Sequence, residues 1–441
     1  MRSKKIRDPV FGFITVEGKE LDILNSLVLQ RLRGIKQLAL ADLVYPGALH
    51  TRFDHSLGVL FVADLLSKHL SLRSKDRRII RLSALLHDVG HGPFSHVSEY
   101  MLRDSNPGGA FGNEDTEELH ERIGINIIKD HSDIPRVLGK ETDKVIELLS
   151  KVPERTLAKD IISGPMDADK MDYLLRDANF CGVKYGIFDV HQVIDMTVCI
   201  KEGGETYLGV KEKGIYAIEQ MILAKYHMDR QVYQHKVRCI TDAMVIRGLK
   251  YAINENCEEI RSLYTIEPQN QEYYKNYLHY DDTTLFSVVI GKGGKWAREY
   301  FKRLKERRLL KVLLKMPLEE VPDDLKKNKI VEMETDQKEK EIAGILSIPE
   351  QLVVIDKRTE KHPTYKKPGQ EIGARIDPND IMVQMEDGKR RKLTKESKIF
   401  TEEIKPEEEV IWVYVAADRI SKWKKRKTEL ANKVKEIILR D

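Results

Sequence analysis

The strongest constraint on the fold is a helical periodicity that extends from about residue 20 to residue 315. Apolar residues recur there at spacings of three and four, loops are short and β-branched runs are few. Residues 56–70 are apolar nearly all round, which predicts a buried helix, and residues 214–255 are long enough for one extended helix. Ahead of this region, the segment from Val10 to Val16 alternates enough to predict a short strand or hairpin. The chain is therefore predicted to be mainly α, with a short N-terminal β hairpin.

The pattern changes after Pro317. Residues 318–350 are rich in acidic residues and lysine, which predicts a charged linker or an exposed helix. A lysine-rich helix is expected near 417–439, and three short β-like runs precede it at 351–356, 380–385 and 409–415. We therefore expect three parts: a helical domain over 1–317, the charged segment over 318–350, and a small α+β C-terminal domain over 351–441.

Composition limits the classes of function. The 75 basic and 71 acidic residues leave a net charge of +4, which alone gives no argument for nucleic acid, although local basic patches could hold phosphates. Four cysteines, with no C-x-x-C pair among them, favour a reducing cytoplasm over a disulfide framework. The chain start has no secretory apolar region, and no apolar run is long enough to span a bilayer. A cytoplasmic protein without a membrane partner is expected.

The stretch SALLHDVGHGPFSH at 83–96 gathers metal-seeking side chains at the end of a predicted buried helix. An apolar stripe is followed by residues that end the helix: Leu82, Leu85, Leu86 and Val89, then Gly90, Gly92 and Pro93. A buried aspartate beside a histidine, here Asp88 beside His87, is costly unless it is paired or bound to a metal. Imidazole with carboxylate suits Mn, Fe, Ni or Zn, and Mg less well. Further ligands are expected from His55, at the start of the buried helix, and from an acid within 164–180.

The stretch GPMDADKMDYLLRDANF at 164–180 has two distinct faces when it is laid on a helix at 100° per residue. One face is an apolar core stripe: Met171, Leu174, Leu175 and Ala178. The opposite quadrant holds an acid, a cation, an aromatic ring and a second acid: Asp169, Lys170, Tyr173 and Asp177. Such a face supplies the kinds of side chain that a nucleotide site needs.

Taken together, these residues resemble the HD-domain phosphohydrolases, and among them the deoxynucleoside triphosphate (dNTP) triphosphohydrolases. The likeness runs from DPVFGFI at 8–14 to YQHKV at 233–237 and more weakly to about 310. Its most specific blocks stand in the order of the family: QRLRGIKQL, TRFDHSLGV, LLHDVGHGPFSH, DADKMDYLLRD and YQHKV. The resemblance implies an HD-domain helical core, with the catalytic domain over 1–317. It also implies hydrolysis of a dNTP to a deoxynucleoside and inorganic triphosphate.

The resemblance also implies which residues form the site. One divalent ion (Mn, Fe, Ni, Zn or Mg) would be held by His55, His87, Asp88 and Asp169, and an additional Mg would accompany the triphosphate. The residues expected around the α-phosphate are His91, His96, His120, Glu99 and Asp167. The residues expected to bind the substrate are Gln37, Leu38, Arg52, Lys170, Tyr173, Asp177, Lys225 and Tyr233. The family has an arginine at the position of Lys225 and an aspartate at that of Glu99.

Individual roles follow from the same resemblance. Arg52, Lys170 and Lys225 would hold the triphosphate, and Tyr173 would pack against sugar and phosphate. Gln37 and Asp177 would read the sugar 3′-hydroxyl, while Leu38 and Tyr233 would crowd the 2′ position and exclude ribonucleotides. The leaving 5′-oxygen needs a general acid. His96 oriented by Asp167 is the first choice for that acid, and His120 paired with Glu99 is the alternative.

Regulation is a further expectation from the resemblance. In some relatives a guanine nucleotide bound between subunits assembles the active oligomer, and Gln30 and Arg33 are the residues carried over from that site. Asn25 stands where those relatives have an aspartate, and an amide reads a guanine edge differently because it can also donate. We expect a homo-oligomer, with a tetramer built from dimers favoured.

Two other classes of function remain open. One is an HD phosphohydrolase that acts on another phosphorylated nucleotide, either a nucleoside monophosphate or an alarmone. The other is a non-catalytic nucleotide sensor or nucleic-acid-binding regulator, to which the basic runs KWKKRK at 422–427 and GKRRK at 388–392 give some support. Such runs are more often solvated faces, and these lack the interleaved aromatic residues of a single-strand binding surface.

Overall fold

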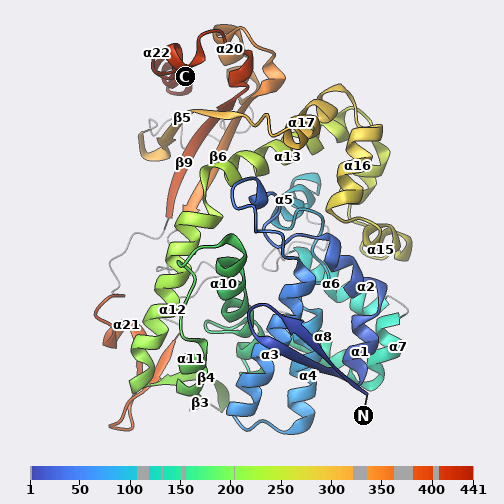
Figure 1. Cartoon of the computed structure of the whole chain (residues 1–441), viewed down its shortest axis with the longest axis vertical. Coiled ribbons are helices and arrows are strands. Elements are labelled where there is room, and N and C mark those ends of the chain that lie inside the picture. Colours follow the sequence, from blue (N-terminus) through green and yellow to red (C-terminus); the bar gives the residue numbers. More distant parts are fainter. Residues whose placement is uncertain are drawn as a thin grey trace. The chain divides into compact units, whose positions relative to one another are not determined.

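Helices dominate the computed structural model, as the sequence predicts (Figure 1). The structure describes residues 2–106, 119–130, 133–150, 155–202, 204–320, 335–361, 381–400 and 407–440. The chain divides into two compact units. The first comprises Met1–Tyr233, Arg261–Phe286 and Pro363–Ile404, and the second comprises Gln234–Ile260, Ser287–His362 and Lys405–Asp441.

The first unit begins with a hairpin, β1 (Ser3–Asp8) and β2 (Gly12–Glu17), which pair antiparallel with Ile6 opposite Ile14. The helices that follow are α1 (Lys19–Leu24), α2 (Leu27–Arg31), α3 (Arg52–His69), α4 (Ser74–Leu86), α5 (His96–Ser105), α6 (Leu119–Asp130), α7 (Asp133–Leu138), α8 (Thr142–Leu149), α9 (Leu157–Ser163), α10 (Ala168–Cys181), α11 (Val190–Met196) and α12 (Ile215–Met228). A π-helical turn, η5 (Asp229–Tyr233), follows α12, and α15 (Gln271–Leu278) also belongs to this unit. Two further helices, α14 (Glu258–Tyr264) and α16 (Asp282–Lys292), have residues in both units.

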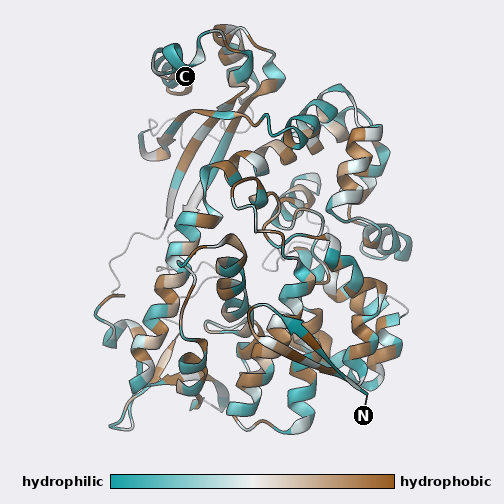
Figure 2. Ribbon diagram, viewed as in Figure 1, coloured by the Kyte–Doolittle hydropathy of each residue, from teal (hydrophilic) through white to brown (hydrophobic). Residues whose placement is uncertain are grey.

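Helix α3 is the centre of the first unit, where it packs against α4 and α10. Its start is fixed by a capping box, because Thr51 accepts from the backbone of Asp54 while the Asp54 carboxylate accepts from the backbone of Thr51. The helix is buried on nearly every side, as the apolar run at 56–70 predicts. Figure 2 shows brown, hydrophobic stretches along α3 and α4. The capping box sets the first turn of α3 and therefore the position of His55.

Two small sheets complete the description of the strands. In the first unit, β3 (Thr197–Glu202) and β4 (Glu205–Lys211) pair antiparallel, β4 pairs in parallel with β7 (Met382–Gln384), and β7 pairs with β8 (Arg390–Lys392), ahead of the short helix α21 (Leu393–Glu396). In the second unit, β9 (Glu407–Val415) lies between β5 (Lys311–Pro317) and β6 (Val353–Lys361) and pairs antiparallel with both. Each β-like run predicted after residue 350 overlaps one of these strands.

The second unit also contains the helices α13 (Lys236–Asn254), α17 (Lys295–Lys305), α20 (Thr335–Leu346) and α22 (Trp423–Ile438). Its core joins the sheet to α20 and α22 through buried side chains that include Ile342, Val413 and Leu430. Residues 335–346 were assigned by their charge to a linker or an exposed helix. They form α20, which is exposed on one face and buries Ile342 and Leu346 on the other. The expected domain boundaries at 317 and 350 stay a prediction.

The predicted N-terminal hairpin is present; it begins at Ser3, and the alternating run from Val10 matches its second strand. Two local expectations need correction. The hairpin of β3 and β4 lies in the region predicted as mostly helical, and Gly204, with φ of +91°, lies in its turn. Residues 214–255 form two helices, because the π turn follows α12 and the His235 side chain caps α13 by accepting from the backbone of Val237. The spacing of apolar residues does not reveal a break between two helices, because both helices keep a buried apolar face.

Candidate active site

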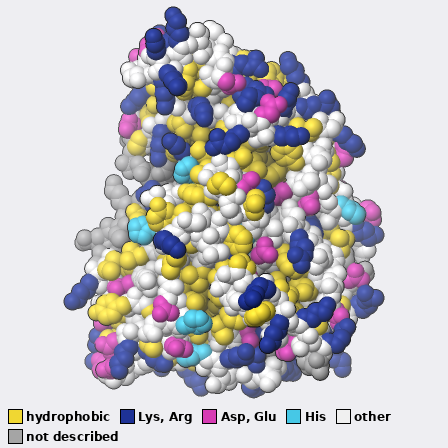
Figure 3. Space-filling view, viewed as in Figure 1, with side chains coloured by type: hydrophobic (Ala, Val, Ile, Leu, Met, Phe, Trp, Pro, Cys, Tyr) yellow, Lys and Arg dark blue, Asp and Glu magenta, His cyan; other side chains and the backbone are white. Residues whose placement is uncertain are grey.

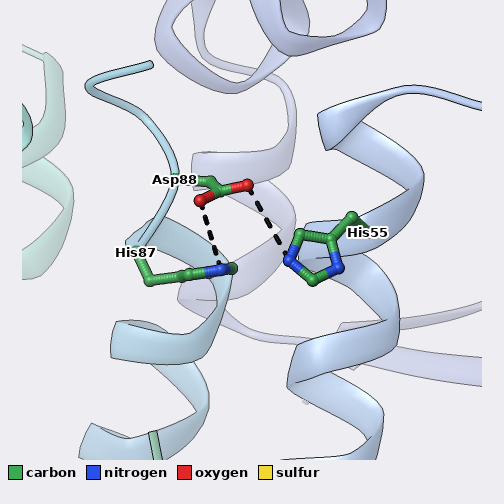
Figure 4. Close-up of side chains that lie close together, drawn as sticks. All are labelled: His55, His87 and Asp88. Carbon is green, nitrogen blue, oxygen red and sulfur yellow. Dashed lines mark ion pairs between the residues drawn. The ribbon is translucent and has the colours of Figure 1, made fainter. Parts of the chain in front are cut away.

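Two histidines and one aspartate lie together where α3 approaches the C-terminal end of α4 (Figure 4). One ligand atom from each of His55, His87 and Asp88 lies within 4.8 Å of the other two. His87 is the C-cap of α4, and its Nδ1 lies 2.8 Å from the carbonyl oxygen of Ala84. That contact places the hydrogen on Nδ1 and leaves a lone pair on Nε2. The Nε2 atom is buried and has no hydrogen-bond partner among the described residues.

Asp169, near the start of α10, adds a second carboxylate. Its Oδ1 lies 2.9 Å from His55 Nε2 and 3.9 Å from His87 Nε2. The side chain of Asp169 is 30% exposed, whereas those of His55 and Asp88 are 1% and 6% exposed. The four side chains therefore form a cluster that is closed on the protein side and open beside Asp169.

The cluster fits a divalent metal ion. Two imidazole nitrogens and two carboxylates form a donor set suited to first-row transition ions. The Nε2 of His87 lies 3.4 Å from Asp88 Oδ1 but has no hydrogen bond among the described residues, and a bound ligand explains such a buried polar atom. The ring of His55 is also oriented for metal binding. Its Nδ1 lies 2.7 Å from Asp172 Oδ2, which leaves its Nε2 facing the cluster. The predicted ligand set is thus brought together in space, and its role in binding a metal stays a prediction.

Charge is concentrated around these ligands. Burial would lower the pKa of His55, but its hydrogen bonds with Asp169 and Asp172 outweigh burial and raise the pKa to about 10. Burial would raise the pKa of Asp88, but the Arg52 guanidinium and the nearby histidines hold it well below its usual range. The Nη1 of Arg52 donates to Asp88 Oδ2 at 2.6 Å. Arg52, predicted to hold phosphate, therefore lies in contact with a predicted metal ligand.

The three remaining predicted histidines lie next to the cluster. The rings of His91 and His120 are stacked with centroids 3.7 Å apart, and the His96 ring meets His91 edge-on at 5.8 Å. Burial and the charge of Arg52 hold the pKa of His91 well below its usual range. His96 is exposed at the start of α5, as a residue that meets a substrate must be. Asp167, predicted to support His96, instead has its described contacts with Lys170, and its support of His96 stays a prediction.

Glu99 holds His120 in the way the sequence predicts, despite being a glutamate where the resembled family has an aspartate. Its carboxylate lies 3.0 Å from His120 Nδ1 and also accepts from the backbone N–H groups of His120 and Leu119, at 3.0 and 2.7 Å. Burial would raise the pKa of Glu99, but the hydrogen bond and charge of His120 outweigh it and lower the pKa from 4.5 to about 2. The glutamate therefore fixes both the start of α6 and the ring of His120.

This lowered pKa predicts a pH-dependent stability. Because the folded-state pKa of Glu99 lies below 4.5, its contribution is fully present above that pH and is lost as pH falls toward about 2. A shift from 4.5 to about 2 corresponds to about 3 kcal/mol at pH 7. We expect E99Q to lower the free energy of unfolding by up to that amount at pH 7, and by less than half of it near pH 3. Urea unfolding at both pH values checks this, and an undiminished difference at pH 3 would contradict it.

Several predicted substrate residues lie on and around α10. The Nζ of Lys225 lies 5.0 Å from the ring centroids of both Tyr173 and Tyr233, so Lys225 and Tyr233 lie close together although the π turn separates Tyr233 from α12. Tyr173 also lies near His55, with ring centroids 6.5 Å apart. Lys170 is buried, and its ammonium group donates to Asp167 at 2.6 Å and to the carbonyl of Gly164 at 3.0 Å. Leu38 is buried.

Gln30 and Arg33, predicted to bind an effector, contact each other on the surface of the first unit. Arg33 Nε donates to Gln30 Oε1 at 3.0 Å, and its guanidinium lies 3.5 Å from the centroid of the Phe53 ring. Gln30 also donates to the carbonyl of Leu24. An effector role for these two residues stays a prediction.

Sequence reasoning missed three buried residues that support the site: Asp172, Arg176 and His50. Arg176 binds Asp172 through two nitrogens and also donates to Asp8 of the hairpin at 2.8 Å. A Cβ atom at Gly58 would lie 1.7 Å from Asp172 Oδ1, so a glycine is needed for this pair to approach α3. The spacing of four between Asp172 and Arg176 is a helical ion-pair signal that could have identified them. His50, two residues before Arg52, carries no comparable signal.

The two basic runs belong to different units of the chain. Lys424 and Lys425 are exposed on α22 in the second unit, while Arg391 in the first unit pairs with Asp387 and Glu396. Figure 3 shows Lys and Arg side chains interspersed with Asp and Glu over the visible face. Among the described residues, no helix is both long enough and apolar enough to cross a membrane.

Comparison with known proteins shows that the candidate metal ligands lie in a segment that matches a protein-family model. A family model described as the HD domain matches residues 52–177, and one described as the HD associated region matches residues 188–388. The first match contains the four predicted metal ligands. The uncharacterized protein MJ1154 of Methanocaldococcus jannaschii is 37% identical over 59% of this chain and 52% of its own length. The uncharacterized protein YwfO of Bacillus subtilis is 33% identical over 56% of each chain.

Another relative has an activity in its name. The deoxynucleoside triphosphate triphosphohydrolase SAMHD1 of Homo sapiens is 28% identical over 55% of this chain and 43% of its own length. The chain thus spans about half the length of these curated relatives. Among solved structures, a hypothetical protein from Aquifex aeolicus aligns over 97% of this chain and all of its own, with a TM-score of 0.71 and 28% identity.

Proposed function

The chain belongs to the HD-domain proteins and has the HD phosphohydrolase fold, and from that premise we propose that it is a metal-dependent hydrolase of dNTPs. The observation that carries the proposal is the buried cluster of His55, His87 and Asp88, with Asp169 at its open side. It lies beside three more histidines and the cluster of Lys225, Tyr173 and Tyr233. The likeness to dNTP triphosphohydrolases at 28% identity supports the choice of substrate.

The proposed reaction converts a dNTP and water into a deoxynucleoside and inorganic triphosphate. Water forms a bond to the α-phosphorus, the bond from that phosphorus to O5′ breaks, and O5′ takes up a proton. A divalent ion (Mn, Fe, Ni, Zn or Mg) held by the four ligands would supply a water of lowered pKa and polarise a phosphoryl oxygen. An additional Mg would accompany the triphosphate.

The side chains of the protein supply the remaining chemistry. Arg52, Lys170 and Lys225 offset the negative charge of the triphosphate, which would otherwise repel the attacking oxygen. His96 donates the proton that O5′ takes up, and its exposed position at the start of α5 supports that role. His91, whose pKa is held well below its usual range, contacts the α-phosphate as a neutral ring.

The sugar is read by residues around Asp177. Gln37 and Asp177 contact the 3′-hydroxyl, Tyr173 packs against the sugar, and Leu38 and Tyr233 exclude a 2′-hydroxyl. Support comes from the hydrogen bond that the Tyr233 hydroxyl donates to Asp177 Oδ2 at 2.6 Å. This hydrogen bond holds the Tyr233 ring, which would exclude a 2′-hydroxyl, next to the Asp177 carboxylate, which would bind the 3′-hydroxyl.

The proposal extends to assembly. We expect a homo-oligomer, with a tetramer favoured, and a nucleotide effector bound near Gln30 and Arg33. The exposure of Arg33 supports access by such a ligand. Light scattering with and without added guanine nucleotide tests this, and a monomer that is fully active without nucleotide would contradict it.

Product analysis tests the function. The protein is incubated with Mn²⁺ and, separately, each dNTP, NTP, deoxynucleoside monophosphate and ppGpp in ¹⁸O-labelled water. We expect deoxynucleoside and triphosphate in equal amounts from dNTPs, with the label in triphosphate only. NTPs should react at least roughly 10-fold more slowly. The D88N variant, which lacks one ligand charge, serves as the inactive control.

The alternatives give other products. Orthophosphate from a monophosphate, or breakdown of ppGpp, would identify a hydrolase of another phosphorylated nucleotide. No product across the panel from a protein that carries its metal would favour a non-catalytic nucleotide sensor.

A further inference from the structure

A buried histidine outside the predicted site contacts the carboxylate expected to read the sugar. His50 precedes α3 and is 2% exposed. Its Nε2 lies 2.7 Å from Asp177 Oδ1, and its ring stacks on Phe180 with centroids 4.7 Å apart. The stack fixes the plane of the imidazole, so the ring can reach Asp177 only in one orientation.

The carboxylate of Asp177 is held from both sides. His50 contacts Oδ1, while the Tyr233 hydroxyl donates to Oδ2 at 2.6 Å. The three residues come from the segment before α3, from α10 and from the π turn after α12. The carbonyl oxygen of His50 also accepts from the backbone N–H of Gln37 at 3.0 Å. One histidine thus connects both residues that are expected to contact the 3′-hydroxyl.

Three polar atoms around this network are buried and have no hydrogen-bond partner among the described residues. They are Gln37 Oε1, His50 Nδ1 and the hydroxyl of Tyr173. Leaving a buried polar group without a hydrogen bond destabilises the folded state. These side chains adjoin the network, because Gln37 binds the backbone of His50 and the Tyr173 ring lies 6.3 Å from that of Tyr233. Buried polar atoms without a partner indicate a polar ligand.

We propose that His50 is a positioning residue, which holds the carboxylate of Asp177 so that the pocket selects ligands with a free hydroxyl at C3′ of the sugar. This inference rests on the proposed function and deepens it. A carboxylate oxygen accepts hydrogen bonds, so the Nε2 of His50 is the donor to Asp177 Oδ1 in this contact. With Oδ1 fixed by His50, Oδ2 is directed toward Tyr233 and toward a donor that enters the pocket.

Two variants separate the hydrogen bond from the packing. In H50F the ring and its stack on Phe180 are kept and the Nε2 donor is lost. In H50Q the ring is lost, but the side-chain amide places a donor near the former Nε2. Each variant is compared with wild type on dNTPs and on the matching 2′,3′-dideoxynucleoside triphosphates, with thermal melting as the folding control.

Wild type should prefer the dNTP by roughly 10–100-fold in kcat/KM, the range expected for a hydrogen bond to a charged group. In H50F the kcat/KM for the dNTP should fall toward that of the dideoxy substrate, whose own value should change by less than about 3-fold. H50Q should restore most of the preference. Equal losses on both substrates, or a full preference in H50F, would overturn the proposal.

A binding measurement distinguishes this proposal from the proposed function. If wild type hydrolyses no dNTP, the proposed function fails, and calorimetry with a dNTP and its dideoxy analogue in Ca²⁺ tests His50 directly. Tighter binding of the dNTP by wild type, lost in H50F and recovered in H50Q, would support the positioning role. Equal binding of both nucleotides by wild type would overturn it. In a double-mutant cycle, the effects of H50F and D177N should be non-additive. In D177N the carboxylate that His50 positions is already absent, so losing His50 as well should have little further effect.

Discussion

The D169N variant is expected to lose its divalent ion and to hydrolyse dNTPs at least roughly 10³-fold more slowly than wild type. A bound metal stabilises the transition state by several kcal/mol, and each 1.36 kcal/mol is a factor of ten in rate. Asp169 is the ligand at the open side of the cluster, 2.9 Å from His55 Nε2. An amide there keeps the size of the side chain but removes the charge that a divalent ion needs. Metal content per chain, measured by plasma mass spectrometry, checks the result independently of activity.

A matched control is available on α3. Asp64 is a buried carboxylate on the same helix as His55, and its described ion pairs are with Arg77, Lys68 and Arg81, away from the ligand cluster. The D64N variant should lose stability but keep its metal. If D169N retained a full equivalent of metal, or if D64N lost its metal to the same extent, Asp169 would not be a ligand.

The H96A variant should lose roughly 10²–10⁴-fold in kcat, the range of general acid catalysis, while its metal content stays at the wild-type value. His96 is exposed and lies beside His91, whereas the four ligands are grouped around α3, α4 and α10. Its loss should therefore leave the metal cluster intact. Steady-state kinetics with metal analysis on the same sample measure both quantities.

A substrate with a better leaving group sharpens this test. A dNTP analogue with sulfur at the 5′ bridging position needs little protonation, so H96A should hydrolyse it at nearly the wild-type rate. The H120A variant is the comparison, because His120 is the alternative general acid and Glu99 orients its ring. If H120A showed the larger loss and the selective rescue, the general acid would be His120. Loss of metal in H96A would make His96 a structural or ligand residue.

The sequence predicted the parts of the site that depend on local patterns. The helix that ends at Leu86 and the glycines after it place His87 and Asp88 at a helix end, and the structure has them there. The helical period likewise placed Met171, Leu174 and Ala178 in the core, where each is fully buried, whereas Leu175 of the same predicted stripe is only partly buried. These outcomes follow from spacing within a single element, which a sequence displays directly.

The parts that could not be predicted depend on contacts between elements. His50 has no distinctive signal in the sequence, and the pairing of Asp172 with Arg176 does not reveal its partner His55; only the packing between elements brings these residues to Asp177 and His55. The short strand β7 pairs with β4, more than 170 residues earlier, as well as with its neighbour β8, and not with β6 or β9. Its alternation predicted a strand but held no information about the partner, because pairing is decided by tertiary packing.

Crystallographic anomalous scattering from a crystal grown with manganese tests the central claim most directly. We expect one strong peak bonded to His55, His87, Asp88 and Asp169 at about 2.1 Å, the range of such metal–ligand bonds. A crystal that showed no peak between these four side chains, or showed Asp169 turned away from His55, would contradict the assignment of a metal-dependent active site.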